Sequence, residues 1–212
     1  MSDCVDWSLR GDLFWARFGT DGSGGKYSKD LVLRRCGFSA VTFDDGINNG
    51  LVFGECPGRH TVPRAELYAL ARVIRFRTKP PITVYVDPTW LVRSYYGHRS
   101  HTLLGNNADL WQQLWKDVDA RGGRGTVQVL HINSHRPAVH AALGVLPLEG
   151  WLLNHAADAL ADRAAKIYQV AEADAKMVMY WRNRTRVVQR RILSAHKQFI
   201  ALFPRPEIPR AP

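Results

Sequence analysis

The sequence of 212 residues contains only three cysteines, and it has no apolar run long enough to cross a membrane. Cys4, Cys36 and Cys56 are widely spaced and form no CxxC or Cys/His metal pattern, which favours a reducing compartment. The first ten residues, MSDCVDWSLR, lack the basic flank and long apolar stretch of a secretory signal. We therefore expect an intracellular protein, in the nucleus or the cytoplasm, that is monomeric and does not bind membranes.

Positive charge is what the sequence has in excess. The formal net charge is +10 at pH 7, and residues 166–212 alone carry +7 of it. A nearly balanced body with a basic tail favours a polyanionic partner such as nucleic acid, because contacts of Lys and Arg with phosphates release condensed counterions. A basic surface that serves only solubility is an equal alternative.

The hydrophobic pattern predicts an α/β fold with five strands. The expected strands cover residues 14–18, 31–43, 51–54, 82–87 and 126–132, with a hairpin connection at 44–50. Helices are expected from Pro63 to the KPP segment at 79–81, at 88–96, at 106–120 and in one continuous register from 151 to 203, after an irregular stretch at 133–150. Three consecutive strands followed by alternating elements predict a mixed five-stranded sheet that is antiparallel in its front half and flanked by helices.

This pattern also predicts how the chain is divided. We expect a domain at residues 13–168, a basic helical extension at 169–203 and a loose, Pro-rich tail at 204–212.

A lone carboxylate, Asp21, follows the first predicted strand in the stretch TDGSGG, and the simplest interpretation of this stretch is a turn without a catalytic role. Candidate partners are Glu66 in the first turn of a predicted helix, Asp87 at the end of the fourth strand, and Asp158 on the last helix of the body. Strands one and four can be neighbours in such a sheet, so Asp21 and Asp87 could lie side by side. Converging carboxylates repel one another unless divalent cations neutralise them, and two Mg²⁺ ions about 4 Å apart can catalyse phosphodiester cleavage.

Each of these acids also has an ordinary structural explanation. Glu66 could complement a helix dipole, the Asp87-Pro88 pair could form a turn, and Asp158 with Asp162 could belong to a solvated helix face. The combination of the acids, rather than any single one, favours a metal site.

Five segments carry a resemblance to a known family: TDGS, RAELYAL, VYVD, NADLWQQLW and NHAADALAD, in this order. Over residues 13–168 the sequence resembles the type 1 ribonuclease H family, and its TDGSGG and RAELYAL segments look more like a retroelement-encoded, non-LTR-retrotransposon-like copy than a cellular enzyme. The resemblance implies a ribonuclease H-like fold. It also implies an endonuclease that hydrolyses the RNA strand of RNA–DNA hybrids and leaves a 3′-hydroxyl and a 5′-phosphate.

The resemblance also implies roles for individual residues. Asp21, Glu66, Asp87 and Asp158 match the carboxylates that bind two Mg²⁺ ions, for which Mn²⁺ is a possible substitute. His135 matches a mobile histidine that helps product release, although an ordinary loop histidine is an equal alternative and His131 and His140 compete for the role. Gly22 and Ser23 would approach the RNA strand, and Arg64 in the Arg-x-Glu motif would contact nucleic acid. Asn107 and Asn154 match polar positions and are expected to cap helices.

The sequence departs from the family at several positions. Pro88 replaces the usual Ser after the third acid, Val62 and Pro63 replace asparagines that touch the duplex, and the segment from 135 to 154 is longer. These departures affect the expected contacts with the nucleic-acid substrate more than the expected metal ligands. They leave open a catalytically weak or silent nucleic-acid-binding module of a reverse transcriptase polyprotein, in which the reverse transcriptase domain would be a partner.

The basic tail has two interpretations as well. Arg182, Arg186 and Arg190 lie on a predicted helix that could serve as a nucleic-acid handle, or as a linker helix with a solvated charged face.

Overall fold

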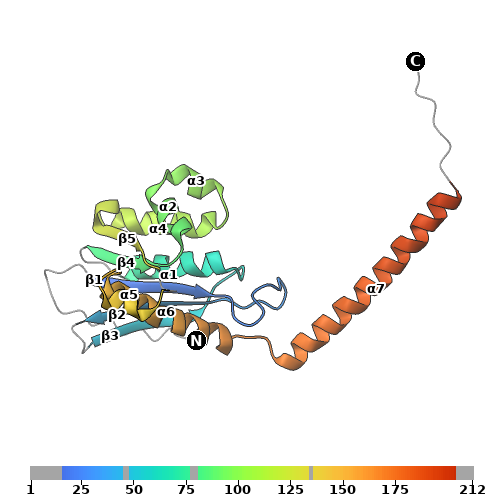
Figure 1. The fold of residues 1–212 in the computed structure, drawn as a ribbon. Coiled ribbons are helices and arrows are strands. Elements are labelled where there is room, and N and C mark those ends of the chain that lie inside the picture. Colours follow the sequence, from blue (N-terminus) through green and yellow to red (C-terminus); the bar gives the residue numbers. More distant parts are fainter. Residues whose placement is uncertain (1–15, 45–47, 77–80, 134–135, 204–212) are drawn as a thin grey trace, which may run out of the picture. The chain divides into compact units, whose positions relative to one another are not determined.

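The computed structural model describes residues 16–44, 48–76, 81–133 and 136–203 (Figure 1). The chain divides into two compact units, with the break between Gln169 and Val170, and each unit is described by itself. Within the described ranges, no helix is both long enough and apolar enough to span a lipid bilayer.

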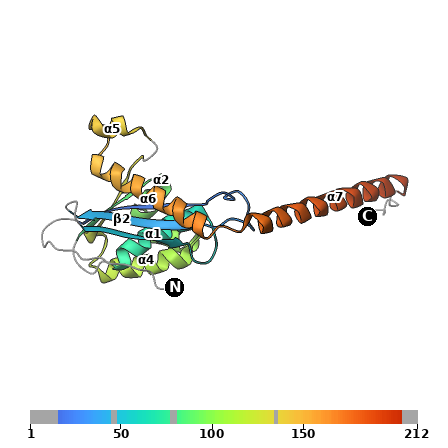
Figure 2. The same ribbon diagram turned by 90° about the horizontal axis from the view of Figure 1, so that it is seen from below.

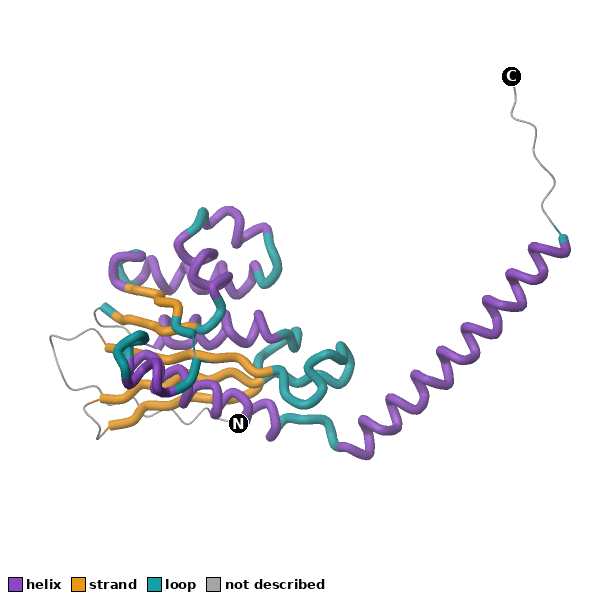
Figure 3. Tube along the Cα trace, in the orientation of Figure 1, coloured by secondary structure: helices purple, strands orange, loops and turns teal. Residues whose placement is uncertain are grey.

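The first unit is built on a five-stranded mixed sheet, as the sequence predicts (Figure 3). Its strands are β1 (Ala16–Ser23), β2 (Gly37–Asp44), β3 (Asn48–Glu55), β4 (Ile82–Val86) and β5 (Val127–His131). The spatial order is β3-β2-β1-β4-β5; β1, β2 and β3 pair antiparallel, whereas β4 runs parallel to both β1 and β5. The β2–β3 pairing agrees with the predicted hairpin, although residues 45–47 of its connection lie outside the described residues.

Helices cover both faces of this sheet. They are α1 (Val62–Phe76), α2 (Thr89–Tyr96), α3 (Arg99–Leu104), α4 (Ala108–Ala120), α5 (Ala138–Ala142) and α6 (Leu148–Ile167), together with the 3-10 turn η1 (Arg124–Thr126). α6 packs on one face, and α1, backed by α4, packs on the other (Figure 2). In the described part of the second unit, residues 170–203, there is one helix, α7 (Glu172–Leu202).

Five sequence-based element assignments were wrong. The first strand extends through Ser23, so Asp21 lies inside it and pairs with Ser39 instead of forming a turn. The second strand begins only at Gly37, because Asp30 accepts the backbone N–H groups of Val32 and Leu33 in a local turn. The irregular segment at 133–150 contains α5 and the start of α6, and residues 99–104 form α3 rather than a loop.

The fifth wrong assignment concerns the late helix, which does not run continuously from 151 to 203. α6 ends at Ile167, and Gln169 turns its side chain to accept the backbone N–H of Lys26 at 3.1 Å. A new helix, α7, then starts with Glu172 and Asp174 in its first turn, where carboxylates favour a helix N-terminus. Periodicity alone did not reveal this interruption, because the apolar register continues across it.

α6 lies unusually close to the sheet because small residues meet on both sides. Its inward side carries the fully buried Ala157, Ala161 and Ala164. Opposite them, a Cβ added to Gly37 would lie 2.4 Å from the backbone oxygen of Ala161, and one added to Gly19 would lie 2.4 Å from the backbone of Leu153. The helix backbone therefore rests directly on β1 and β2, which fixes the position of every side chain that α6 directs toward the sheet end.

Candidate active site

Two of the predicted acids come from neighbouring parallel strands. Thr20 of β1 is in register with Val86 of β4, so the next residues, Asp21 within β1 and Asp87 directly after β4, lie at the same end of the sheet. Asp21 is buried, with 8% of its surface exposed, whereas Asp87 is half-buried. The strand order expected from the sequence is thus what brings these two carboxylates together.

Glu66 reaches the same place from the other face of the sheet, and Gly22 makes this possible. A Cβ on Gly22 would lie 2.5 Å from the backbone nitrogen of Glu66, so any larger residue would push α1 away from β1. The backbone N–H of Gly22 also donates to the carboxyl groups of both Asp21 and Glu66. Gly22 therefore has a structural role at the site, and its predicted approach to RNA stays a prediction.

Asp158 completes the group from α6, where its side chain is exposed. Its carboxyl is hydrogen-bonded to that of Asp21, and Asp21 is hydrogen-bonded in turn to Glu66, which also feels the charge of Asp87. The carboxyl cluster, which we define as Asp21, Glu66, Asp87 and Asp158, thus brings together four acids from four different elements. Asp162, one turn further along α6, lies outside the cluster and pairs with Lys166 at 2.5 Å.

The electrostatics of the cluster are those of crowded, buried acids. Burial and the negative charge of Asp158 raise the pKa of Asp21 from 3.8 to about 7. Burial and the neighbouring Asp21 raise the pKa of Glu66 well above its ordinary value, with a further contribution from Asp87. The two innermost carboxyls therefore hold protons at a pH at which ordinary carboxyls have lost theirs.

This arrangement predicts a pH-dependent stability when no divalent cation is present. In the unfolded chain Asp21 ionises near 3.8, but in the folded protein it ionises near 7. The stability that its proton contributes is complete below pH 3.8 and is lost as the pH rises through 7. As the pH rises across this window, we expect the unfolding free energy of the wild type to fall, relative to that of Asp21→Asn, by on the order of 2–4 kcal/mol. Urea titrations in EDTA at several pH values measure it, and parallel profiles for the two proteins would contradict it.

The residues of the cluster suit a hard divalent cation by their chemistry. All four donors are carboxylates, the ligands that Mg²⁺ and Mn²⁺ prefer, and Oε2 of Glu66 is buried without a hydrogen-bond partner among the described residues. Within the described ranges, however, no three His, Cys, Asp or Glu side chains are already arranged as a metal cage. The carboxyls would have to exchange their mutual hydrogen bonds for cation contacts.

Arg64 makes contacts that the sequence did not reveal. Its guanidinium donates to both carboxylate oxygens of Asp109, at 2.9 and 2.6 Å, and also to the side chain of Asn107 and the carbonyl of Pro57. It therefore ties α1 to the start of α4, and the nucleic-acid contact expected of it stays a prediction. Asn107 occupies the N-cap position of α4, but its side chain makes no capping hydrogen bond.

The other predicted site residues are placed as follows. Ser23 ends β1 and is half-buried, His135 lies outside the described residues, and Arg182, Arg186 and Arg190 lie on α7 in the second unit. Pro88 is the N-cap of α2, where a missing N–H leaves no helical hydrogen bond unmade.

One neighbour of the site was misread from the sequence. Asn154 does not cap a helix but lies within α6, one turn before Asp158, and it is completely buried. Neither its Oδ1 nor its Nδ2 has a hydrogen-bond partner among the described residues. The NHAAD spacing, which sets the two residues four apart on one helix face, was the available signal.

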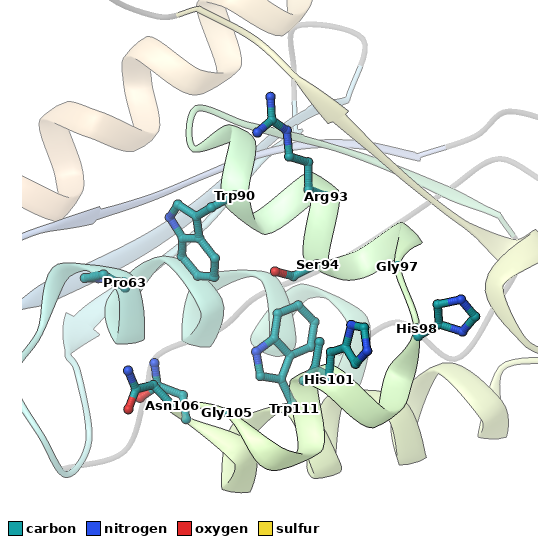
Figure 4. Close-up of a pocket in the computed structure, with 12 residues that line it drawn as sticks. Pro63, Trp90, Arg93, Ser94, Gly97, His98, His101, Gly105, Asn106 and Trp111 are labelled. Atoms are coloured by element: carbon teal, nitrogen blue, oxygen red, sulfur yellow. The ribbon is translucent and has the colours of Figure 1, made fainter.

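A cavity of about 450 Å³ is lined by residues of α1, α2, α3 and α4 and of the segments between them (Figure 4). Its walls include Pro63, three residues before Glu66, and Trp90, three residues after Asp87. Trp111, Arg93, His98 and His101 add further aromatic and basic groups, and the close-up shows Trp90, Trp111 and His101 gathered around one space. We call this the aromatic pocket; its lining combines ring faces with cationic groups, a combination that suits a nucleic-acid strand.

No protein-family model matches the sequence, and no curated protein matches it significantly. Solved structures do match. The Prototype Foamy Virus protease–reverse transcriptase is 17% identical with a TM-score of 0.56, and the match covers 81% of this chain and 23% of that chain. The foamy viral protease–reverse transcriptase in complex with an RNA/DNA hybrid is 16% identical with a TM-score of 0.53, covering 78% and 22%. The PFV RNase H domain in solution is 18% identical with a TM-score of 0.52, covering 72% and 94%.

The chain thus spans less than a quarter of the two protease–reverse transcriptase chains but nearly all of the separate domain. At these identities the likeness establishes the fold alone. The expected ribonuclease H-like fold, a five-stranded mixed sheet flanked by helices, is confirmed.

Proposed function

We propose that this protein is an endonuclease that hydrolyses the RNA strand of RNA–DNA hybrids. The observation that carries the proposal is the convergence of the carboxyl cluster, four acids far apart in the sequence, at one end of a ribonuclease H-like sheet. Crowded buried carboxyls destabilise a folded protein unless protons or cations neutralise them, and perturbed pKa values of this kind are typical of functional sites.

The carboxyl cluster would hold two Mg²⁺ ions, with Mn²⁺ as a substitute. When bound, the ions would supply an activated water and stabilise the leaving oxygen of the phosphodiester. Asp21 and Glu66, both buried, would supply rigid ligands shielded from solvent, and the more accessible Asp87 and Asp158 would supply the remaining ligands. Gly22 keeps α1 close enough for Glu66 to take part.

The hybrid would be cut where the cluster meets solvent, and one of its strands would run on into the aromatic pocket. We expect Trp90→Ala to weaken hybrid binding by about 5- to 150-fold, the loss of ~1–3 kcal/mol of stacking, with a smaller effect on the rate at saturation. Trp90→Phe, which keeps a ring, should restore most of the affinity. KM and kcat measured for both variants test this, and an equal loss in kcat would place Trp90 in the chemistry instead.

α7 would add a basic surface that binds the phosphates of the hybrid. Arg186 and Arg190 are exposed on a helix whose basic groups outnumber its acids. The double change Arg186→Gln/Arg190→Gln should lower hybrid affinity and reduce the slope of log K against log salt by up to about 2, since each phosphate contact contributes about one unit. An unchanged slope would leave α7 without this role.

The decisive experiment uses a hybrid with a labelled RNA strand, incubated with the full chain and Mg²⁺. We expect cleavage of the RNA in the hybrid, with 3′-hydroxyl and 5′-phosphate ends, and none of single-stranded RNA or duplex DNA. EDTA and Asp87→Asn should each abolish cleavage. If wild type and Asp87→Asn both bind the hybrid and leave it whole, the protein is a silent nucleic-acid-binding module of the same fold.

We further propose a retroelement origin, with a reverse transcriptase domain of the same polyprotein as partner. The foamy viral neighbours, in which a chain of this fold is part of a protease–reverse transcriptase, support this proposal. A reverse transcriptase reading frame continuous with the coding sequence would test it.

A further inference from the structure

Asn154 is a buried amide that the fold itself does not use. Its side chain is fully enclosed, with none of its surface exposed. Buried polar atoms nearly always have a hydrogen-bond partner, and each one without a partner costs the folded protein free energy. Among the described residues, however, neither Oδ1 nor Nδ2 of Asn154 has one. An amide kept at such a cost indicates a role beyond holding the fold together.

The backbone around Asn154 is held firmly against the sheet. A Cβ on Gly19 of β1 would lie 2.7 Å from the backbone nitrogen of Asn154 and 2.4 Å from the carbonyl of Leu153. One turn earlier in α6, a Cβ on Gly150 would lie 2.7 Å from the ring of Tyr85 in β4. This part of α6 therefore has no room to shift, and the position of the amide is fixed with it.

The amide lies on the side of the sheet from which Asp21 takes part in the carboxyl cluster. Side chains alternate between the two faces of a strand, so residues two apart share a face. Asp21 comes two residues after Gly19 in β1, and Gly19 is in contact with α6 at Asn154. Asp21 therefore faces α6, as its hydrogen bond to Asp158 of that helix also shows.

Helix geometry then brings Asp158 next to the amide. Asn154 and Asp158 are four residues apart in α6, so they are neighbours on one helix face. Helical side chains tilt toward the helix N-terminus, which directs the carboxyl of Asp158 back over the turn that carries Asn154. Amide and carboxylate side chains at this spacing can form a hydrogen bond.

We propose that Asn154 is a positioning residue for Asp158 at the cation site, an inference that rests on the proposed function. When the carboxyls exchange their mutual hydrogen bonds for cation contacts, Nδ2 of Asn154 would donate to one oxygen of Asp158 and leave the other oxygen to the cation. Asp158 is exposed, so its carboxylate would otherwise be free to adopt several rotamers. Hydrogen-bond partners that orient a metal ligand typically raise metal affinity by about 10- to 100-fold.

Mn²⁺ titration of the full chain at pH 8, followed by the EPR signal of the free ion, tests the proposal with two neighbouring alanine variants. Asn154 and Leu153 are both completely buried, but Leu153 belongs to an apolar cluster with Ile132 and Ala157. We expect Asn154→Ala to weaken Mn²⁺ binding by at least ~10-fold. Leu153→Ala should bind Mn²⁺ nearly as tightly as the wild type.

Thermal unfolding in EDTA should rank the same two variants in the opposite order. Leu153→Ala leaves a cavity in a packed cluster and should lower Tm by several degrees. Asn154→Ala removes two buried atoms that have no partner among the described residues and supplies a better helix former, so Tm should be nearly unchanged or higher. A residue that only held α6 in place would lose Tm together with Mn²⁺ affinity.

The two measurements separate this inference from the proposed function. Unchanged Mn²⁺ affinity in Asn154→Ala would overturn the positioning role and leave the cation site in place. So would a loss of affinity accompanied by a fall of Tm in EDTA as large as that of Leu153→Ala. If the wild type itself bound no Mn²⁺, the proposed cation site would be wrong, and the role of Asn154 would be wrong with it.

Discussion

Glu66→Gln is expected to reduce cleavage of RNA–DNA hybrids by at least ~10³-fold while raising the thermal stability of the cation-free protein. Glu66 occupies the centre of the carboxyl cluster, hydrogen-bonded to Asp21 and within the field of Asp87. An amide at this position keeps the size of the side chain but cannot offer a negatively charged oxygen to a cation. The loss should appear in kcat, because the transition state needs the cation site whereas most of the hybrid surface binds elsewhere.

The gain in stability has a separate cause. Burial, Asp21 and Asp87 all raise the pKa of Glu66, so ionising this carboxyl inside the folded protein is unfavourable at neutral pH. Glutamine removes that cost, and its amide can donate to Asp21. We therefore expect Tm in EDTA to rise by several degrees at pH 8, with a smaller rise at acidic pH, where ionisation of this carboxyl is less demanded.

The matched control for both measurements is Asp162→Asn. Asp162 is a half-exposed acid on α6 whose carboxylate pairs with Lys166 at 2.5 Å, outside the cluster. Its replacement should leave kcat within a factor of about two and Tm nearly unchanged, because exposed ion pairs contribute little. An active Glu66→Gln protein would remove the proposed role of the cluster, and an inactive but less stable one would mean that Glu66 is structural.

The site could be anticipated from the sequence because it depends on strand order. Once β1 and β4 are taken as neighbours, Asp21 and Asp87 must emerge together, whatever the details of the loops. Glu66 and Asp158 were candidates because each lies on a helix that could reach that end of the sheet, and the resemblance to the ribonuclease H family selected them. Such long-range juxtapositions survive errors of several residues in the element boundaries, and the wrong start of β2 did not affect them.

Other features depend on contacts that no local pattern reveals. The role of Gly22 arises from the backbone of α1 lying against β1, and the role of Arg64 arises from Asp109, which lies 45 residues away. Just after the end of α6, Gln169 accepts the backbone N–H of Lys26, which is 143 residues away. Periodicity describes which side of an element is apolar, but it does not say where a side chain from a distant segment will arrive.

The position of Asp158 depends on how closely α6 approaches the sheet, and Gly37→Ala is expected to destroy that approach. The added Cβ would lie 2.4 Å from the oxygen of Ala161 and 2.4 Å from the nitrogen of Ala165, and neither backbone atom can move without moving the helix. We expect the free energy of unfolding to fall by about 3 kcal/mol or more, a large part of the stability of an ordinary domain. Urea titration monitored by tryptophan fluorescence measures it.

Gly125→Ala is the matched control, because a Cβ at Gly125 would have no atom within 4 Å. There the same substitution should be neutral or stabilise by about 0.4–1 kcal/mol, since it only restricts the unfolded chain. In Gly37→Ala, hybrid cleavage should be lost even under conditions where the protein stays folded, because α6 carries Asp158 away from Asp21 as it moves. If Gly37→Ala were as stable and as active as Gly125→Ala, the close contact between α6 and β2 would not be what holds the fourth carboxylate at the site.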